Sequence, residues 1–78
     1  MPTVLRIGPY RFFFYSNDWQ EPLHIHVERD DAKAKFWLSP VRFARSEVFS
    51  GAELNQIQRL VETNVEKLRR SWNEHFNC

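Results

Sequence analysis

The sequence has 78 residues, a formal net charge of +1, and seven Phe, three Trp and two Tyr. A chain of this length is expected to form one domain over residues 1–78, in which large aromatic side chains enlarge a small core. The low net charge excludes a general attraction to nucleic acid or to membranes, so any such contact must come from a local patch.

The single cysteine, Cys78, excludes an internal disulfide. Small proteins without disulfides are typical of the cytoplasm. The N-terminus shows no apolar signal sequence, and no segment reaches the roughly 20 apolar residues that a membrane span requires. We therefore expect a cytoplasmic protein with no membrane association.

Two β-rich segments, residues 3–7 and 10–15, flank the dipeptide Gly8-Pro9. Gly-Pro suits a tight type II′ turn, so these segments predict a β-hairpin. The predicted pairs are Ile7 with Tyr10, Leu5 with Phe12, and Thr3 with Phe14. Arg6 then faces Arg11 directly, which is unfavourable unless an anion lies nearby.

A second hairpin is predicted after a loop at residues 16–22, in which Trp19 either fills a gap in the core or marks a contact surface. Strands at residues 23–29 and 33–38 flank a turn at Asp30-Asp31. The predicted apolar pairs are Leu23–Leu38, Ile25–Phe36 and Val27–Ala34, and the polar pairs are His24–Trp37, His26–Lys35 and Glu28–Lys33. In this register the apolar residues share one face of the hairpin, and the other face has a pair of opposite charges. A shift of one residue would mix apolar and polar residues on both faces, so the pattern supports the register.

The remaining residues predict an edge element and a helix. Residues 41–49 read as a short edge strand or an extended linker. Ser50-Gly51-Ala52-Glu53 is a capping box that begins one amphipathic helix running to about Phe76. The predicted fold is therefore α+β: a small antiparallel sheet from two β-hairpins, with a possible edge strand, packed against one long C-terminal helix.

The main candidate site is the pair His24 and His26, which share the polar face of their strand. Imidazoles at this spacing could bind zinc or copper. Further ligands could come from Glu28, His75 or Cys78. The cation of Lys35 beside His26 opposes a metal, so we expect no metal and no other cofactor.

The same lysine favours acid–base chemistry. A neighbouring ammonium disfavours the imidazolium form, so His26 would be neutral at neutral pH and able to accept a proton. With His26 as base, His24 as acid and Lys35 beside them, the site would suit metal-independent RNA cleavage, with phosphate held by Arg6 and Arg11. The alternative is that both histidines are structural and lie on an ordinary exposed strand face.

A second surface combines basic and aromatic residues on the face of the sheet that we expect to be open. Its members are Arg6, Arg11, Phe13, Tyr15 and Trp37. Such side chains stack on unpaired bases, but they also anchor protein partners. Because monomers seldom leave large apolar patches bare, we favour a protein partner, or a second copy in a homodimer, over RNA.

Four segments carry a resemblance to a known family: residues 1–7 (MPTVLRI), 11–17 (RFFFYSN), 21–27 (EPLHIHV) and 34–38 (AKFWL). Together they resemble the small bacterial proteins grouped as "domain of unknown function 4160". This family often has a second proline where the chain has Leu23. The family is uncharacterised, so the resemblance supplies no catalytic residue.

The resemblance does imply a bacterial cytoplasmic protein with a dedicated protein partner. Members commonly lie beside a second small gene of the "domain of unknown function 2442" type, and such pairs look like toxin–antitoxin modules. We therefore expect a component of such a two-gene module that binds its small partner through the open sheet face and that cleaves RNA if it is the toxin. The alternative is a non-enzymatic regulatory or adaptor protein.

Overall fold

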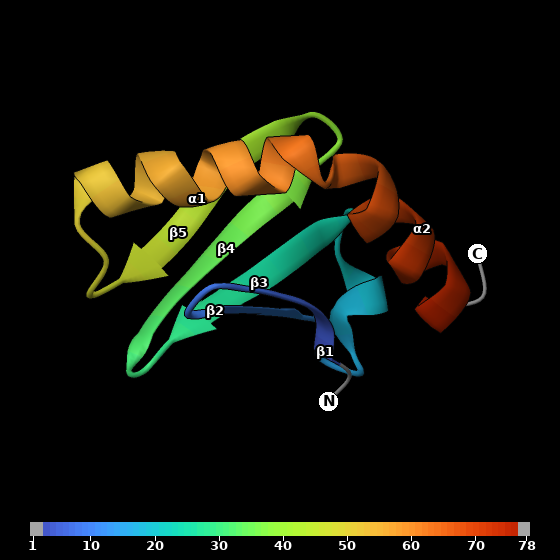
Figure 1. The fold of residues 1–78 in the computed structure, drawn as a ribbon. Helices are drawn as coiled ribbons and strands as arrows, with labels where there is room; N and C mark the ends of the chain where they lie inside the picture. The colour runs from blue at the N-terminus through green and yellow to red at the C-terminus, as the bar shows by residue number, and fades with distance from the viewer. Residues whose placement is uncertain (1–2, 77–78) are drawn as a thin grey trace.

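A computed structural model describes residues 3–76 as a five-stranded antiparallel sheet with two helices. The strands lie side by side in chain order, and α1 runs across the sheet while α2 lies at one end of it (Figure 1). The elements are β1 (Thr3–Ile7), β2 (Tyr10–Phe13), the 3₁₀ helix η1 (Asp18–Gln20), β3 (His24–Arg29), β4 (Ala32–Leu38), β5 (Val41–Glu47), α1 (Gly51–Thr63) and α2 (Val65–Phe76). The predicted α+β class is confirmed.

The second hairpin has the predicted register. β3 and β4 pair as His24–Trp37, Ile25–Phe36, His26–Lys35, Val27–Ala34 and Glu28–Lys33. The amide of Leu38 also donates to the carbonyl of Leu23 at 3.0 Å, which extends the pairing by one step. Of the two predictions for the following segment, the edge strand is correct.

The first hairpin departs from prediction at its open end. Leu5 faces Phe12 as expected, but Thr3 faces Phe13 because the register shifts between Thr3 and Leu5. Phe14 therefore leaves the ladder and becomes fully buried, with its ring 5.2 Å from that of Trp72.

The paired cations of the first hairpin have a counter-ion. Arg6 faces Arg11 across the hairpin, and Arg11 forms an ion pair with Glu28 on the next strand. This carboxylate relieves the like-charge repulsion that the register creates.

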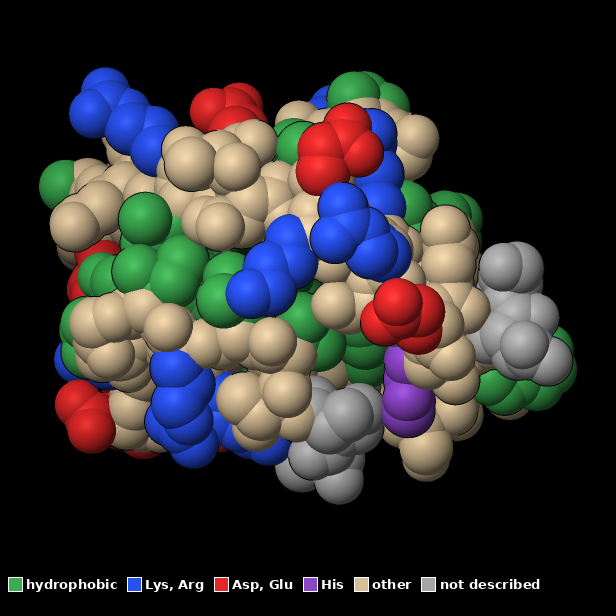
Figure 2. Space-filling view, turned by 45° about the vertical axis from the view of Figure 1, so that its right-hand side comes forward, with side chains coloured by type: hydrophobic (Ala, Val, Ile, Leu, Met, Phe, Trp, Pro, Cys, Tyr) green, Lys and Arg blue, Asp and Glu red, His purple; other side chains and the backbone are tan. Residues whose placement is uncertain are grey.

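The core lies between the sheet and the helices. Its fully buried members include Phe12, Ile25, Val27 and Phe36 from the strands and Ile57, Val61 and Leu68 from the helices. Each such side chain contributes about 1.5–3 kcal/mol through burial. Partly buried hydrophobic residues surround this core, and Figure 2 shows hydrophobic side chains reaching the surface among charged and polar ones.

The predicted single helix is divided into two at Asn64. The Asn64 side-chain amide donates to the carbonyl of Leu60 at 2.8 Å, a bond that competes with regular helix geometry. α2 begins after this break, and its Trp72 reaches Phe14 and His24. Within residues 3–76, neither helix is long and apolar enough to cross a membrane.

The N-terminus of α1 has one half of the predicted capping box. The Ser50 hydroxyl accepts from the amide of Glu53 at 3.2 Å. The Glu53 carboxylate accepts instead from Arg29, at 2.8 and 3.0 Å, and from the Tyr10 hydroxyl at 2.7 Å. These bonds attach the start of α1 to β2 and β3, and they hold the pKa of Glu53 below its usual value.

Val48 follows β5 in a strained backbone conformation. Its φ is +76°, and its side chain is 70% exposed. A β-branched residue in the left-handed region costs about 1–3 kcal/mol. Because the side chain is mostly exposed, its packing contributes little stabilisation to offset this cost.

We expect Val48→Asn to raise the free energy of unfolding by about 1 kcal/mol, because Asn tolerates positive φ. Urea denaturation measures the change. Val41→Asn, at the first residue of β5 and outside the positive-φ region, is the control and should be destabilising, since Val41 is partly buried against the core and Val favours strands. A Val48→Asn variant no more stable than the parent would contradict the strain.

Candidate functional site

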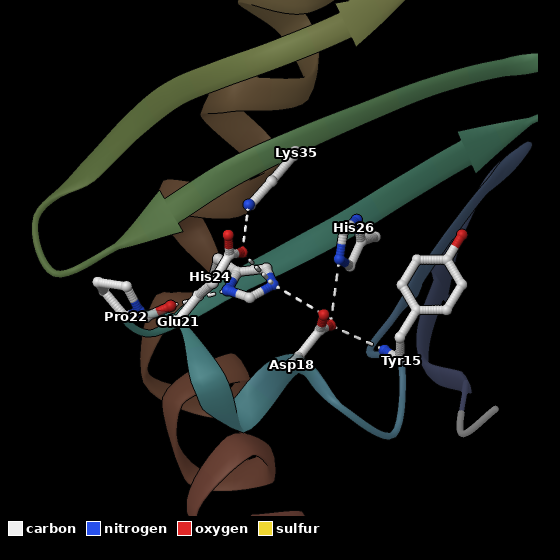
Figure 3. A network of polar contacts seen from close by, with 7 residues as sticks. All are labelled: Tyr15, Asp18, Glu21, Pro22, His24, His26 and Lys35. Atoms are coloured by element: carbon white, nitrogen blue, oxygen red, sulfur yellow. Dashed lines mark hydrogen bonds and ion pairs between the residues drawn. The ribbon is translucent and has the colours of Figure 1, made fainter.

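A polar cluster lies where residues 14–23 cross the start of β3 (Figure 3). Asp18, the first residue of η1, directs its carboxylate toward both β3 histidines. Its Oδ1 lies 3.2 Å from Nε2 of His24, and its Oδ2 lies 3.1 Å from Nε2 of His26. Asp18 is not among the site residues predicted from the sequence, which placed it in the loop at residues 16–22.

The backbone of the loop fixes Asp18. The Tyr15 amide donates to Asp18 Oδ2 at 2.8 Å, and the Asp18 amide donates back to the Tyr15 carbonyl at 3.1 Å. The side chain of Asp18 is buried, and a buried carboxylate must be paired or hydrogen-bonded to be tolerated. This turn therefore aims a charge into the protein, where the two imidazoles face it.

His24 has no exposed surface, so the prediction that it lies on an open face is wrong. Its Nδ1 lies 2.7 Å from the Pro22 carbonyl oxygen. Because a carbonyl only accepts, Nδ1 carries a proton and donates it, and Nε2 is the atom left facing Asp18. The ring packs against Trp72 and Trp37, at centroid distances of 5.2 and 5.8 Å.

His26 is partly buried and makes close aromatic contacts. Its ring stacks on Phe13 at 5.5 Å and meets Tyr15 edge-on at 4.7 Å. Burial lowers the pKa of His26, and the nearby His24 and Lys35 lower it further against the opposing effect of Asp18. The effect of Lys35 has the predicted direction, but burial is the larger cause.

Lys35 is balanced by a carboxylate. Its Nζ lies 2.5 Å from Oε1 of Glu21 and 4.6 Å from the ring centroid of Trp37. The Lys35 ammonium holds the pKa of Glu21 below its usual range. The predicted pairing of Lys35 with His26 in the sheet is correct, but the ammonium is directed to Glu21.

The predicted aromatic patch is not on the surface. Phe13 is only 2% exposed, because the guanidinium of Arg11 lies 4.3 Å above its ring and the rings of Tyr15 and His26 pack against it. Tyr15 and Trp37 are half-buried, and Arg6 alone of the predicted patch is exposed. The face that we expected to be open is covered by the loop containing η1.

Other hydrophobic side chains are exposed instead. They are Trp19 at 63%, Phe43 at 46% and Val48. Trp19 therefore does not fill a gap in the core, and its second interpretation, a contact surface, fits its exposure.

The metal ligands considered from sequence do not converge on the histidines. Glu28 is paired with Arg11, His75 is exposed with its ring 6.1 Å from that of Phe14, and Cys78 lies outside the described residues. Within residues 3–76, the His/Cys/Asp/Glu group that could hold a metal ion consists of Asp18, His24 and His26, whose ligand atoms lie within 4.8 Å of one another.

A small cationic pocket adjoins His26. It has a volume of about 160 Å³ and is lined by Tyr15, His26, Lys33, Ala34, Lys35, Arg45, Ser46 and Glu47. Lys35 faces Arg45 directly across the β4–β5 pair. Like charges in this position are unfavourable without an anion. Glu21 supplies one for Lys35, and Glu47, which faces Lys33, lines the pocket itself. The volume is below the roughly 300–1,000 Å³ of pockets for drug-sized ligands. The pocket therefore suits a group of about the size of one phosphate.

A comparison with known families identifies a match. The family described as "Domain of unknown function (DUF4160)" matches residues 10–73, a range that includes the whole histidine–aspartate cluster. No curated protein and no solved structure matches the chain.

The lowered pKa of His26 predicts how stability changes with pH when a chelator removes metal ions. The unfolded histidine has a pKa of about 6.5, so below that pH the unfolded state binds the proton more readily than the folded state does. The contribution of neutral His26 to the free energy of unfolding should therefore be complete above about pH 6.5 and should decrease toward pH 5. Urea unfolding at several pH values between these limits measures the slope.

His26→Gln should flatten this slope, whereas His75→Gln, at the exposed third histidine, should leave it as in the parent. Glu21 and Glu53 do not contribute in this window, because their pKa values lie below the usual carboxylate value. A His26→Gln slope as steep as that of the parent would show that another group is responsible.

Proposed function

The chain belongs to the DUF4160 family, and from this premise we propose that it is the component of a two-gene, toxin–antitoxin-like module that binds a small protein partner. The neighbouring small gene that the family resemblance implies would encode that partner. The observation that carries the proposal is that edge strand β5 exposes the aromatic side chain of Phe43, with a second exposed apolar side chain, Val48, directly after the strand.

β5 is the last strand of the sheet, so its outer backbone groups have no strand beside them within the described residues. An exposed edge strand is a template for pairing with an extended segment of another chain. Lys35 pairs with Arg45 and Phe36 with Phe43, which leaves Ala44 as an extra, bulged residue. Because a bulge interrupts the ladder, this edge favours a dedicated partner over a second copy of itself.

The side chains along this edge indicate the chemistry of the partner. Phe43 supplies an aromatic anchor, and Arg42 and Arg45 are exposed on the same strand. A partner with an apolar pocket and acidic side chains would complement both features. Val48 adds an exposed apolar group at a strained position, and such strain is retained most often at functional sites.

Binding to the product of the neighbouring gene tests this proposal. We expect Phe43→Asp to weaken binding at least about tenfold, because removal of a central aromatic anchor typically costs more than 1.4 kcal/mol. Isothermal titration calorimetry with the purified partner measures the loss. Asn55→Asp, which adds the same charge on an exposed position of α1, is the matched control and should bind as the parent does.

Val48→Asn provides an independent arm of this test. We expect it to weaken partner binding while it stabilises the free protein, because relief of backbone strain and loss of a contact act in opposite directions. Unchanged affinity in both Phe43→Asp and Val48→Asn would exclude the β5 edge as the docking surface.

RNA cleavage is a second candidate function, and the cationic pocket beside His26 favours it. His24 is buried, so within the described residues His26 is the imidazole that lines this pocket. Arg45 would be the main cation for a phosphate, in place of the Arg6 and Arg11 that the sequence suggested, because Lys35 binds Glu21 and Lys33 faces Glu47.

Expression of the chain without its partner separates this candidate from an adaptor role. A ribonuclease toxin should arrest growth, and His26→Gln or Arg45→Ala should relieve the arrest. His75→Gln is the control and should stay toxic. Absence of arrest in the parent, or arrest that persists in both pocket variants, would exclude cleavage at this pocket.

A further inference from the structure

We propose that Asp18, His24 and His26 bind one zinc ion, through the Asp18 carboxylate and the Nε2 atoms of both imidazoles. The ion would fasten the loop that contains η1 to the start of β3. This proposal does not depend on which partner the β5 edge binds. It is an alternative to His26 as the base of RNA cleavage, because a zinc-bound Nε2 has no free lone pair to accept a proton.

Both Nε2 atoms are buried and lack a hydrogen-bond partner within the described residues. They nevertheless lie 3.2 and 3.1 Å from the two oxygens of Asp18. Buried polar atoms are almost always hydrogen-bonded, so two adjacent exceptions require an explanation. A cation between them satisfies both imidazoles and the carboxylate at once.

Two of the separations between these atoms are those of metal ligands, whereas the whole set lies within 4.8 Å, so an ion would draw the ligand atoms closer together. Tetrahedral zinc with bonds of about 2.0–2.2 Å to nitrogen and oxygen places neighbouring ligand atoms about 3.3 Å apart. The two observed nitrogen–oxygen separations lie within 0.2 Å of this value. The ligand set of two imidazoles and one carboxylate suits zinc rather than magnesium or calcium, which prefer oxygen ligands.

Backbone groups already hold two of the three ligands in position. Nδ1–H of His24 donates a hydrogen bond to the Pro22 carbonyl, so Nε2 of that ring presents its lone pair to the site. The Tyr15 amide donates to Asp18 and fixes the carboxylate. Such outer contacts orient the ligands of known zinc sites. Without a cation, the lone pair of His24 would face a carboxylate, and two acceptors repel each other.

Glu21 is the group that would fill a fourth position. Its Oε1 lies 4.0 Å from Nε2 of His24 and already accepts from Lys35. A carboxylate that binds zinc on one side and a lysine on the other is itself oriented by an outer contact. Lys35, which the sequence presented as an obstacle to a metal, therefore becomes the partner of a ligand.

The test is a titration of the full chain with zinc chloride after treatment with a chelator. We expect one zinc per chain by calorimetry and a rise in Tm of at least about 5 °C in excess zinc, which EDTA reverses. Cobalt(II) as a probe should give the intense visible absorption of a tetrahedral site. In ¹⁵N NMR spectra of the parent, zinc should shift the Nε2 resonances of His24 and His26 but not those of His75.

Variants assign the ligands. Asp18→Asn and His26→Gln should each lower zinc affinity at least about a hundredfold, because loss of a ligand costs more than the 10–100-fold loss that follows removal of an outer contact. Asp18→Asn keeps an oxygen for the Tyr15 amide, so it preserves the turn. Glu21→Gln should cost about tenfold, and His75→Gln should bind as the parent does.

Three results would overturn the proposal. They are absence of stoichiometric binding to the folded parent, full affinity in Asp18→Asn and His26→Gln, and loss of binding in His75→Gln. The NMR measurement does not depend on any variant: Nε2 resonances of His24 and His26 that stay unchanged in zinc would also exclude the site. A His24 protonated on both nitrogens at neutral pH, with no response to zinc, would assign the cluster to an imidazolium–aspartate pair.

Discussion

The contact between the Asp18 carboxylate and the two β3 imidazoles determines how the polar face of the sheet is covered. Asp18 belongs to a loop with little regular structure. The Tyr15 amide and the two histidines contact its carboxylate, and Glu21 and Pro22 attach the end of the same loop to Lys35 and His24. Because this loop lies over the start of β3, His24 and Lys35 become buried. A sheet with one face on the helices therefore gains a second, smaller and polar layer on its other face.

The histidine strand supports both layers because its side chains alternate. Ile25 and Val27 enter the apolar core, while His24 and His26 enter the polar cluster. This alternation was readable in the sequence, and it gave the correct register for the second hairpin. The sequence did not indicate that the side chains of the polar face are buried. Their burial depends on a loop of Ser, Asn, Asp and Pro residues, and such a loop has no periodic pattern. Asp18 could be recognised only once that loop was placed against β3.

The same limit explains the other departures. The apolar repeat of the C-terminal segment continues through Asn64 without interruption, so the sequence pattern did not predict a helix break there. The break accompanies a single hydrogen bond from the Asn64 side chain to the Leu60 carbonyl. Phe13 lies on the polar face of the sheet, as predicted, but its burial was not predicted. The burial comes from stacking by Arg11 and His26, which depends on tertiary structure. Exposed apolar side chains instead include Phe43 on β5 and Val48 directly after it, and β5 is the last strand of the sheet among the described residues.

The candidate site and the β5 edge are connected through Lys35. Its ammonium binds Glu21 on the side of the histidines, and its backbone pairs with Arg45, an exposed residue of β5. If Glu21 coordinates zinc, its carboxylate shares its negative charge with the metal and balances Lys35 less completely. The pocket between Lys35 and Arg45 then becomes more positive, which strengthens its attraction for an anion or for an acidic partner at the β5 edge. Under these two proposals, occupancy of the buried cluster would therefore be coupled by electrostatics to binding at the edge, through the charges of Glu21 and Lys35.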